Sequence, residues 1–401
     1  MTLRILRPAG RTEAEAALFK IGVDPVGVAS MAAKMSHFNI KIPSLECRAA
    51  NIIKQDMLSL GGDAAVARGT VECSIPATDV ILMGTEKQLH RAVKKFRQQP
   101  FGIRKIAEDL DSLLSSADKN FTINYGPGTL DLGGMTHIMG ILNVTPDSFS
   151  DGGRFNNIEA AVARAVEMVN DGAHIIDVGG ESTRPGAVPA SAEEELDRII
   201  PVIEKIASIM DTPISVDTYK AEVAEKALEA GAHIINDISG LTFDKNMASV
   251  AARADCPVIL MHTGGRPQNM QDNPHYDSIM DEILDFLEAS INSAVSAGIS
   301  HEKIIADPGI GFGKRLEDNL AIIKNFGQLK VLDVPLLIGA SRKSFIGQII
   351  GSDPKNTDDR IEGSIAASVL AAASGASIVR VHDVKETNRA LKIADAVKRV
   401  H

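Results

Sequence analysis

Beyond residue 135, short runs of aliphatic and β-branched residues alternate with longer segments in which apolar residues recur at helical spacing. Because the short runs are apolar at nearly every position, they predict parallel strands that are buried on both faces. These predicted strands are near residues 138–144, 175–180, 213–218, 234–239, 257–262, 304–309, 335–341 and 378–384. Helical patterns lie between or after them, among them residues 158–170, 192–209, 220–230, 278–297, 363–373 and 386–397.

Two short patterns repeat along this part of the chain. GAHIID (172–177), GAHIIN (231–236) and GASIVR (375–380) each place Gly-Ala at a helix end, then a short strand, then a polar residue. A second pattern, Asp-x-Pro before an apolar run, begins at residues 211, 255 and 333. Each repeat is one strand and one helix, and eight such units in about 265 residues are what a closed (β/α)8 TIM barrel requires. An open, doubly wound sheet is the alternative.

Residues 1–130 show a different pattern of elements, which predicts a small α+β domain of unknown role. Strands are expected at residues 3–6 and 80–83, and helices at residues 12–18, 45–60, 87–96 and 103–114. The basic cluster Lys94, Lys95 and Arg97 could bind an anion, but a solvent-facing helix surface is the commoner use of such a run. The Gly-rich residues 120–134 predict a linker or a small covering hairpin before the barrel domain at 135–401.

The charge of the chain limits its partners. The 401 residues carry a formal net charge of −10, which argues against broad binding to nucleic acid or to acidic membranes, because attraction to phosphates needs clustered Lys and Arg. Any anion site must therefore be local. No apolar run approaches the roughly 20 residues of a membrane helix, and the N-terminus lacks an apolar signal core, so we expect a cytoplasmic protein.

Cysteine usage gives no sign of a framework of disulfides or of a zinc site. Cys47, Cys73 and Cys256 are few, far apart and odd in number. We expect them to be reduced, buried thiols.

Polar residues stand where the predicted strands end: Asn143, Asp177, Asp217, Asn236, His262, Asp307, Arg342 with Lys343, and Arg380 with His382. A barrel would gather them on one rim, where this fold carries its chemistry. One such residue alone could simply cap a helix or bond a loop amide. As a set, the acceptors suit the N–H-rich edge of a heterocycle, and the cations suit a phosphate or diphosphate.

Loops after three strands add to this picture. GGESTRPGA (179–187) offers two hydroxyls and an arginine in a flexible setting that could grip an anion. DPGIGFGK (307–314) is Gly-rich, which alone is weak support for phosphate binding. Phe149 in the first loop and Phe312 in the latter could clasp an aromatic substrate, although an isolated Phe more often fills the edge of a core.

Seven segments, in this order and spacing, resemble the dihydropteroate synthases of folate biosynthesis: NVTPDSFSDGG, DVGGESTRPGA, SVDT, IND, DPGIGFGK, SRKSF and RVHDV. The resemblance covers residues 135–401. It implies a (β/α)8 barrel that joins 6-hydroxymethyl-7,8-dihydropterin pyrophosphate to p-aminobenzoate and releases pyrophosphate and 7,8-dihydropteroate. C–O cleavage before attack by the amine is the favoured order of steps. The small residues in 363–375 suggest close packing, which a dimer interface and a tightly packed barrel helix explain equally well, and we expect a homodimer.

The resemblance also implies which side chains do the work. The pterin pocket would consist of Asp217, Asn236, Asp307 and Lys343, with Arg342 over the ring, and Asp177 is similar to a family position near the pterin. Pyrophosphate would be anchored by Arg380 and His382, and its Mg²⁺ would be bound by Asn143. The loop that folds over the site would supply Thr183 and Arg184. The p-aminobenzoate pocket would contain Phe149, Pro185, Phe312 and Ser344. Catalysis is expected from Asp217, Asp307, Lys343, Arg380 and His382.

Two other functions share part of this pattern. A methyltetrahydrofolate-dependent methyltransferase that serves a corrinoid protein would use the planar acceptors, but would have no use for cations around a diphosphate. A non-catalytic protein with a retained pterin pocket is a rival of another class, and the complete set of polar strand ends argues against it.

Overall fold

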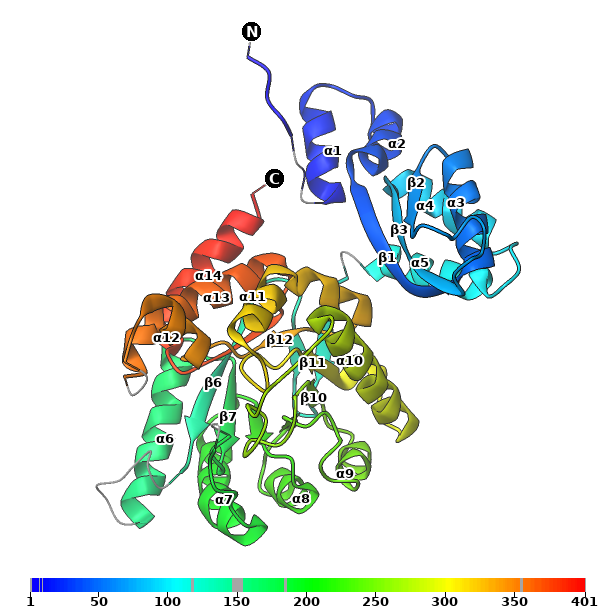
Figure 1. Ribbon diagram of the computed structural model, residues 1–401. Coiled ribbons are helices and arrows are strands. Elements are labelled where there is room, and N and C mark those ends of the chain that lie inside the picture. Colours follow the sequence, from blue (N-terminus) through cyan, green and yellow to red (C-terminus); the bar gives the residue numbers. More distant parts are fainter. Residues whose placement is uncertain are drawn as a thin grey trace. The chain divides into compact units, whose positions relative to one another are not determined.

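The computed structural model describes residues 2–6, 8, 10–116, 119–145, 154–183, 186–353 and 356–400. The chain divides into two compact units, residues 1–119 and residues 120–400 (Figure 1). Within the described ranges, no helix is both long enough and apolar enough to cross a membrane.

The first unit is a small α+β domain, as the sequence predicts. Its antiparallel sheet has the order β1–β3–β2, formed by β1 (His37–Glu46), β2 (Asp63–Val66) and β3 (Ala77–Thr85). Its helices are α1 (Arg11–Lys20), α2 (Pro25–Met35), α3 (Cys47–Ser59), α4 (Glu86–Phe96) and α5 (Ile103–Ser116). The core between sheet and helices includes Ile53, Leu82, Leu89 and Phe96, all fully buried. The strand expected at residues 3–6 does not form, and Leu3 and Ile5 lie 91% and 83% exposed.

The cysteines of this unit correct one expectation. Cys47, the first residue of α3, is joined to Cys73 in a disulfide, with 5.6 Å between the Cα atoms. The expectation of reduced thiols is therefore wrong for this pair, because the turns before β3 bring back a residue that is distant in sequence. Cys256 is free and buried, as expected.

The basic cluster on α4 serves the fold of this unit. Lys95 Nζ lies 2.8 Å from a carboxylate oxygen of the buried Asp56, and the Arg97 guanidinium lies 2.6 Å from Asp111. These pairs favour the structural interpretation of the cluster over an anion site.

The second unit is a (β/α)8 barrel, which confirms the predicted fold class. Its strands are β6 (His137–Asn143), β7 (Ile175–Gly179), β8 (Ile214–Asp217), β9 (Ile234–Asp237), β10 (Val258–Met261), β11 (Ile304–Asp307), β12 (Leu337–Ile338) and β13 (Ile378–Val381). They pair in parallel in the order β11–β10–β9–β8–β7–β6–β13–β12. A parallel bridge between Ala306 and Leu336 joins the two ends of this order, so the sheet closes on itself.

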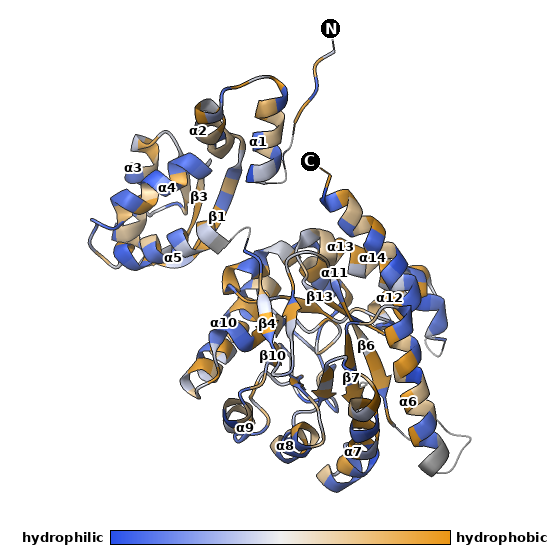
Figure 2. Cartoon of the chain, turned by 180° about the vertical axis from the view of Figure 1, so that it is seen from behind, coloured by the Kyte–Doolittle hydropathy of each residue, from blue (hydrophilic) through white to orange (hydrophobic). Residues whose placement is uncertain are grey.

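Helices surround the strands (Figure 1). They are α6 (Arg154–Asp171), α7 (Ala192–Ile209), α8 (Ala221–Glu229), α9 (Met247–Ala254), α10 (Ile279–Ser296), α11 (Leu316–Lys324), α12 (Ser344–Ile350), α13 (Ile361–Ser374) and α14 (Val384–Lys398). Figure 2 shows hydrophobic strands inside and helices whose outer faces are more hydrophilic. This is the arrangement expected for strands that are buried on both faces.

A hairpin closes the amino end of the barrel. It consists of β4 (Thr122–Asn124) and β5 (Thr129–Asp131), and its residues Ile123 and Leu130 share a buried cluster with residues from the first halves of seven barrel strands. The Gly-rich segment therefore forms the covering hairpin that the sequence offered as one of two possibilities. The opposite, carboxyl end carries the polar rim.

Because this hairpin seals an apolar surface, truncating its central side chain should destabilise the barrel. Ile123 is 1% exposed, and the change Ile123→Ala is expected to lower the free energy of unfolding by about 2–5 kcal/mol. Urea unfolding of the full chain measures this. Thr122→Ala, at an exposed position of the same strand, is the control, and equal effects of the two changes would contradict the packing role.

Candidate active site

Polar side chains from four barrel strands form one cluster around the Arg380 guanidinium. Arg380 on β13 donates from Nε to Asp177 Oδ2 at 2.6 Å and from a terminal nitrogen to Asp217 Oδ2 at 2.5 Å. Asn236 Nδ2, on β9, donates to the same oxygen of Asp177 at 3.1 Å. The two carboxylates and the amide are buried, so the rim predicted from the strand ends forms one hydrogen-bonded cluster.

Two oxygens of this cluster have no partner. Asp177 Oδ1 and Asp217 Oδ1 are buried without a hydrogen bond among the residues that the structure describes. A buried acceptor without a donor costs about 1–3 kcal/mol, so a ligand that brings N–H donors would gain by binding here. Burial raises the pKa of Asp217, with Asp177 nearby adding to this effect and the Arg380 guanidinium opposing it.

Asp307 ends β11 and is held by its own loop. Its Oδ1 accepts a hydrogen bond from the Gly309 backbone N–H at 2.7 Å. Gly309 has φ +68°, and a Cβ there would lie 1.9 Å from the His262 carbonyl oxygen, so only glycine fits this turn. Burial raises the pKa of Asp307 to about 6, although Gly309, Lys314 and Lys343 oppose the shift.

Lys343 lies beside Phe312 on the same rim. Its ammonium is 3.9 Å from the centre of the Phe312 ring, which is a cation–π distance. Burial, together with the charge of Arg380, lowers the pKa of Lys343 to about 8. Phe312 is 6% exposed and packs with Ile238, Met261 and Met270, so the polar cluster is accompanied by an apolar one.

Lys314 is a buried lysine that the sequence did not mark for a role. Its ammonium contacts His262 Nδ1 at 2.9 Å and donates to the carbonyl oxygens of His262 and Phe312 at 3.3 and 3.1 Å. Burial lowers the pKa of Lys314 to about 7. It joins the Gly-rich loop to the end of β10, and its only sequence signal was its place at the end of DPGIGFGK.

Arg342 and His382 are engaged by neighbours in the chain. The Arg342 guanidinium binds both carboxylate oxygens of Asp383, at 2.5 and 3.0 Å, and lies 2.7 Å from Asp358. His382 Nδ1 lies 3.0 Å from the Ser341 hydroxyl, and burial lowers the pKa of the imidazole to about 3. His382 is therefore neutral at neutral pH and can act as a hydrogen-bonding group.

The remaining predicted residues are placed as follows. Asn143 ends β6 and is partly buried, Thr183 is partly buried in the loop after β7, and Ser344 is exposed as the first residue of α12. Phe149, Arg184 and Pro185 lie outside the described residues. In the described ranges, no group of three His, Cys, Asp or Glu side chains could hold a metal ion.

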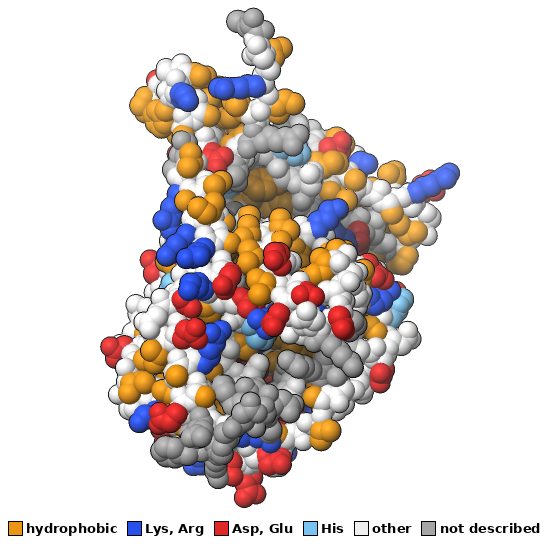
Figure 3. All heavy atoms as spheres, turned by 90° about the vertical axis from the view of Figure 1, so that its left-hand side faces the viewer, with side chains coloured by type: hydrophobic (Ala, Val, Ile, Leu, Met, Phe, Trp, Pro, Cys, Tyr) orange, Lys and Arg blue, Asp and Glu red, His pale blue; other side chains and the backbone are white. Residues whose placement is uncertain are grey.

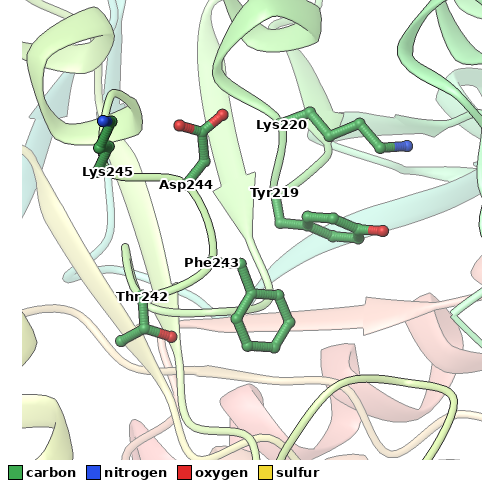
Figure 4. Close-up of a pocket in the computed structure, with 6 residues that line it drawn as sticks. All are labelled: Tyr219, Lys220, Thr242, Phe243, Asp244 and Lys245. Atoms are coloured by element: carbon green, nitrogen blue, oxygen red, sulfur yellow. The ribbon is translucent and has the colours of Figure 1, made fainter.

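A separate depression of about 450 Å³ opens beside the start of α8 and the loop after β9 (Figure 4). It is lined by Tyr219, Lys220, Thr242, Phe243, Asp244 and Lys245. None of the residues predicted for the active site lines it.

The barrel and its rim of paired acceptors and cations define an enzyme for a small heterocycle with an anionic group. The sequence profile of a family described as pterin binding enzyme matches residues 139–382. The chain belongs to this family and, within it, to the dihydropteroate synthases. It is 50% identical over 275 residues to the dihydropteroate synthase of Synechocystis, an alignment that covers 68% of this chain and 94% of the relative.

Solved structures agree with this assignment. A Yersinia pestis dihydropteroate synthase in a sulfonamide drug complex is 46% identical, with a TM-score of 0.66, and the match covers 70% of this chain and all of that one. A Xanthomonas albilineans dihydropteroate synthase with 4-aminobenzoic acid is 43% identical, again with a TM-score of 0.66, over 71% of this chain and all of that one.

A longer relative also matches the first unit. A probable bifunctional folylpolyglutamate synthase/dihydropteroate synthase of Halobacterium salinarum is 41% identical over 386 residues, which are 96% of this chain and 46% of the relative. The α+β unit therefore has a counterpart there, whereas the Synechocystis protein matches only 68% of this chain.

Proposed function

We propose that the chain condenses 6-hydroxymethyl-7,8-dihydropterin pyrophosphate with p-aminobenzoate to give 7,8-dihydropteroate and pyrophosphate. The observation that carries the proposal is the pair of unpartnered buried oxygens, on Asp177 and Asp217, beside Arg380. They offer acceptors for a pterin next to a cation for its diphosphate. The test is pyrophosphate release with both substrates present and with each one alone, with the product identified by mass. Methyl transfer to a corrinoid protein, or binding without turnover, would favour the rival functions.

The pterin half of the reaction uses the planar acceptors. Asp217, Asn236 and Asp307 hold the heterocycle by its N–H edge, Asp177 supports them, and Arg342 covers the ring. As the C–O bond breaks, the methylene carbon becomes a cation that is conjugated to the pterin. Ionised Asp217 and Asp307 stabilise that positive charge. The Lys343 ammonium donates hydrogen bonds to the pterin ring and to the departing oxygen.

The diphosphate half uses Arg380 and His382. Within the described residues, Arg380 bonds through Nε and one terminal nitrogen, so the N–H groups of its other terminal nitrogen are left for a diphosphate oxygen. His382 adds a neutral hydrogen bond at the same place. Absorbing the charge of the leaving pyrophosphate lowers the barrier to C–O cleavage.

The Asn143 carboxamide at the end of β6 fits a magnesium ion. Mg²⁺ commonly keeps several waters and takes one or two protein oxygens together with substrate phosphates, so a single partly buried amide is sufficient. When bound, the ion would neutralise charge on the diphosphate. Removal of divalent cations with EDTA should reduce turnover, and added Mg²⁺ should restore it. Full activity after exhaustive chelation would contradict the assignment.

The arylamine half uses the loops. Phe149, Phe312, Pro185 and Ser344 would form the p-aminobenzoate pocket, and Thr183 and Arg184 would fold over the diphosphate, as the resemblance implies. Because the amine is nucleophilic when neutral, positioning is enough and no strong base is needed. Loop closure keeps water from the cation. Tight binding of p-aminobenzoate without pyrophosphate or pterin would contradict this order of assembly.

Pterin binding should weaken in acid. N–H donors of the ring bind the ionised carboxylates, and burial raises the pKa of Asp307 to about 6 and that of Asp217 above its usual range. As the pH falls below these values, the carboxylates take up protons and stop accepting. We expect the dissociation constant of a pterin to rise at least about tenfold for each pH unit below 6, measured by calorimetry. A constant affinity from pH 8 to pH 5 would contradict this role.

We also propose that the barrel forms a homodimer through its late helices. Exposed apolar residues lie on α12, α13 and α14, namely Ile349, Leu370, Ile393 and Val397. Figure 3 shows apolar side chains among charged ones on the side of the barrel where these helices lie. Light scattering of the wild type and of Leu370→Glu tests this, and an unchanged mass would contradict it. A cytoplasmic location stays a prediction.

The first unit is expected to be dispensable for turnover. The Synechocystis relative matches about two thirds of this chain over nearly its whole length. A shortened chain that begins at Asn120 keeps the hairpin and should retain kcat within about threefold, since no side chain predicted for the active site is removed. Steady-state kinetics of the two chains measures this, and loss of activity with an intact fold would assign the first unit a catalytic role.

A further inference from the structure

We propose that Ser364 and Arg360 are positioning residues that hold the turn before Lys343 in a strained backbone conformation, and so fix where the Lys343 ammonium lies. The inference rests on the proposed function, because Lys343 is assigned there to the pterin ring and to the departing oxygen. Ser364 is in the first turn of α13 and Arg360 directly precedes that helix, so neither belongs to the binding pockets described above.

The strained residue is Arg342. Its φ is +58°, in the left-handed region that is unfavourable for a residue with a Cβ. The Lys343 N–H donates to the Ala340 carbonyl oxygen at 3.4 Å, which closes a tight turn with Arg342 at its third position. Glycine is the usual residue where such a turn requires a positive φ. An arginine keeps this conformation only where the surrounding structure holds it there.

Side chains from the start of α13 bind both backbone groups of Arg342. Ser364 Oγ accepts from the Arg342 N–H at 2.8 Å, and a terminal nitrogen of Arg360 donates to the Arg342 carbonyl oxygen at 2.9 Å. Ser364 Oγ also donates to the Arg360 carbonyl oxygen at 2.6 Å, which joins the two holding residues to each other. Both are buried, so these hydrogen bonds are shielded from water and hold the turn firmly.

The side chain of Arg342 accounts for an arginine at a position that favours glycine. Its guanidinium binds both carboxylate oxygens of Asp383, at 2.5 and 3.0 Å, and so joins the loop after β12 to the loop after β13. A glycine would adopt the positive φ without strain but would lose this ion pair. The chain therefore keeps the arginine, and the bonds from α13 stabilise its backbone.

The turn sets the direction in which the Lys343 side chain leaves the backbone. Lys343 directly follows Arg342, and its ammonium lies 3.9 Å from the centre of the Phe312 ring. On the way its stem passes Gly311, where a Cβ would lie 2.9 Å from Lys343 Cδ, so the stem fits because residue 311 has no side chain. A change in the backbone of Arg342 would move the ammonium, and a displacement of about 1 Å can cost about 10²-fold in rate.

Ser368 provides a matched control for Ser364. Both serines lie in α13 and are 2% exposed, and each donates to the carbonyl oxygen four residues earlier, at 2.6 Å from Ser364 and 2.8 Å from Ser368. Ser364 differs in also accepting from the Arg342 N–H. Ser364→Ala should lower kcat about tenfold and raise the Kd of a pterin about threefold or more, whereas Ser368→Ala should change both less than about twofold. Pyrophosphate release and calorimetry measure the two quantities.

A double-mutant cycle shows whether the hydroxyl acts through the strained turn. Because glycine adopts a positive φ unaided, adding Ser364→Ala to an Arg342→Gly chain should lower kcat less than about twofold, against about tenfold in the wild-type chain. A role of Ser364 in the packing of α13 alone would give the same factor in both chains. Equal factors would therefore overturn the inference.

Arg360→Lys tests the same turn from its carbonyl side and decides the matter if Ser364→Ala does not fold. It keeps a cation but loses the guanidinium that reaches the Arg342 carbonyl oxygen, so kcat should fall, and fall less in the Arg342→Gly chain. Wild-type kcat and pterin affinity in a folded Ser364→Ala enzyme would overturn the inference. Wild-type protein that releases no pyrophosphate would instead refute the proposed function, and the pterin affinities of the same variants would still test the turn.

Discussion

The change Lys343→Ala is expected to abolish most turnover and to weaken pterin binding at the same time. Lys343 lies over the Phe312 ring and interacts electrostatically with Asp307, and in the proposed reaction its ammonium serves both the pterin ring and the departing oxygen. Removing one such preorganised donor should lower kcat by about 10²–10³-fold. Pyrophosphate release and calorimetric titration with a pterin measure the two effects.

A surface lysine provides the control for this prediction. Lys392→Ala, on the exposed part of α14, should leave both quantities unchanged. Wild-type turnover in Lys343→Ala would refute the proposed active site, because the ammonium that lies over the Phe312 ring would then not be needed.

The second large effect is expected from Arg380→Met. Arg380 holds Asp177 and Asp217 together, and without it two buried carboxylates face each other with no cation bonded to either. Breaking a buried ion pair on one side costs about 3–5 kcal/mol, so the variant should unfold at clearly lower urea concentration and should also lose its diphosphate anchor.

The pH dependence separates charge from packing in this variant. Loss of the guanidinium removes the charge that opposes the raised pKa of Asp217, so Asp217 binds a proton more readily in the folded state and the destabilisation should shrink as the pH falls from 8 to 5. Arg380→Lys, which keeps the charge, should recover part of the stability. A destabilisation below about 1 kcal/mol at pH 8 would show that the cluster needs no cation.

The barrel was predictable because its signals are local. Each strand–helix repeat can be recognised by an apolar run and a polar residue at the strand end. The closed sheet then brings those strand ends together. Asp177, Asp217, Asn236 and Arg380 were therefore found from the sequence as members of one rim. Their mutual bonding, with Arg380 between the two carboxylates, required three-dimensional positions.

Other features depended on contacts that no local pattern encodes. The disulfide between Cys47 and Cys73 follows from the fold of the first unit, and spacing alone suggested free thiols. Arg342 pairs with Asp383, which the sequence gave no reason to connect with it. Lys220 looked like an ordinary residue at a helix start until the structure placed two buried glutamates around it. The short run at residues 3–6 has strand character but no partner strand.

The hairpin of β4 and β5 restricts the route by which substrates and products reach and leave the site. Because Ile123 and Leu130 close the amino end of the barrel, both substrates must enter, and both products must leave, at the carboxyl end. In the proposed reaction, pyrophosphate and 7,8-dihydropteroate would therefore share one exit.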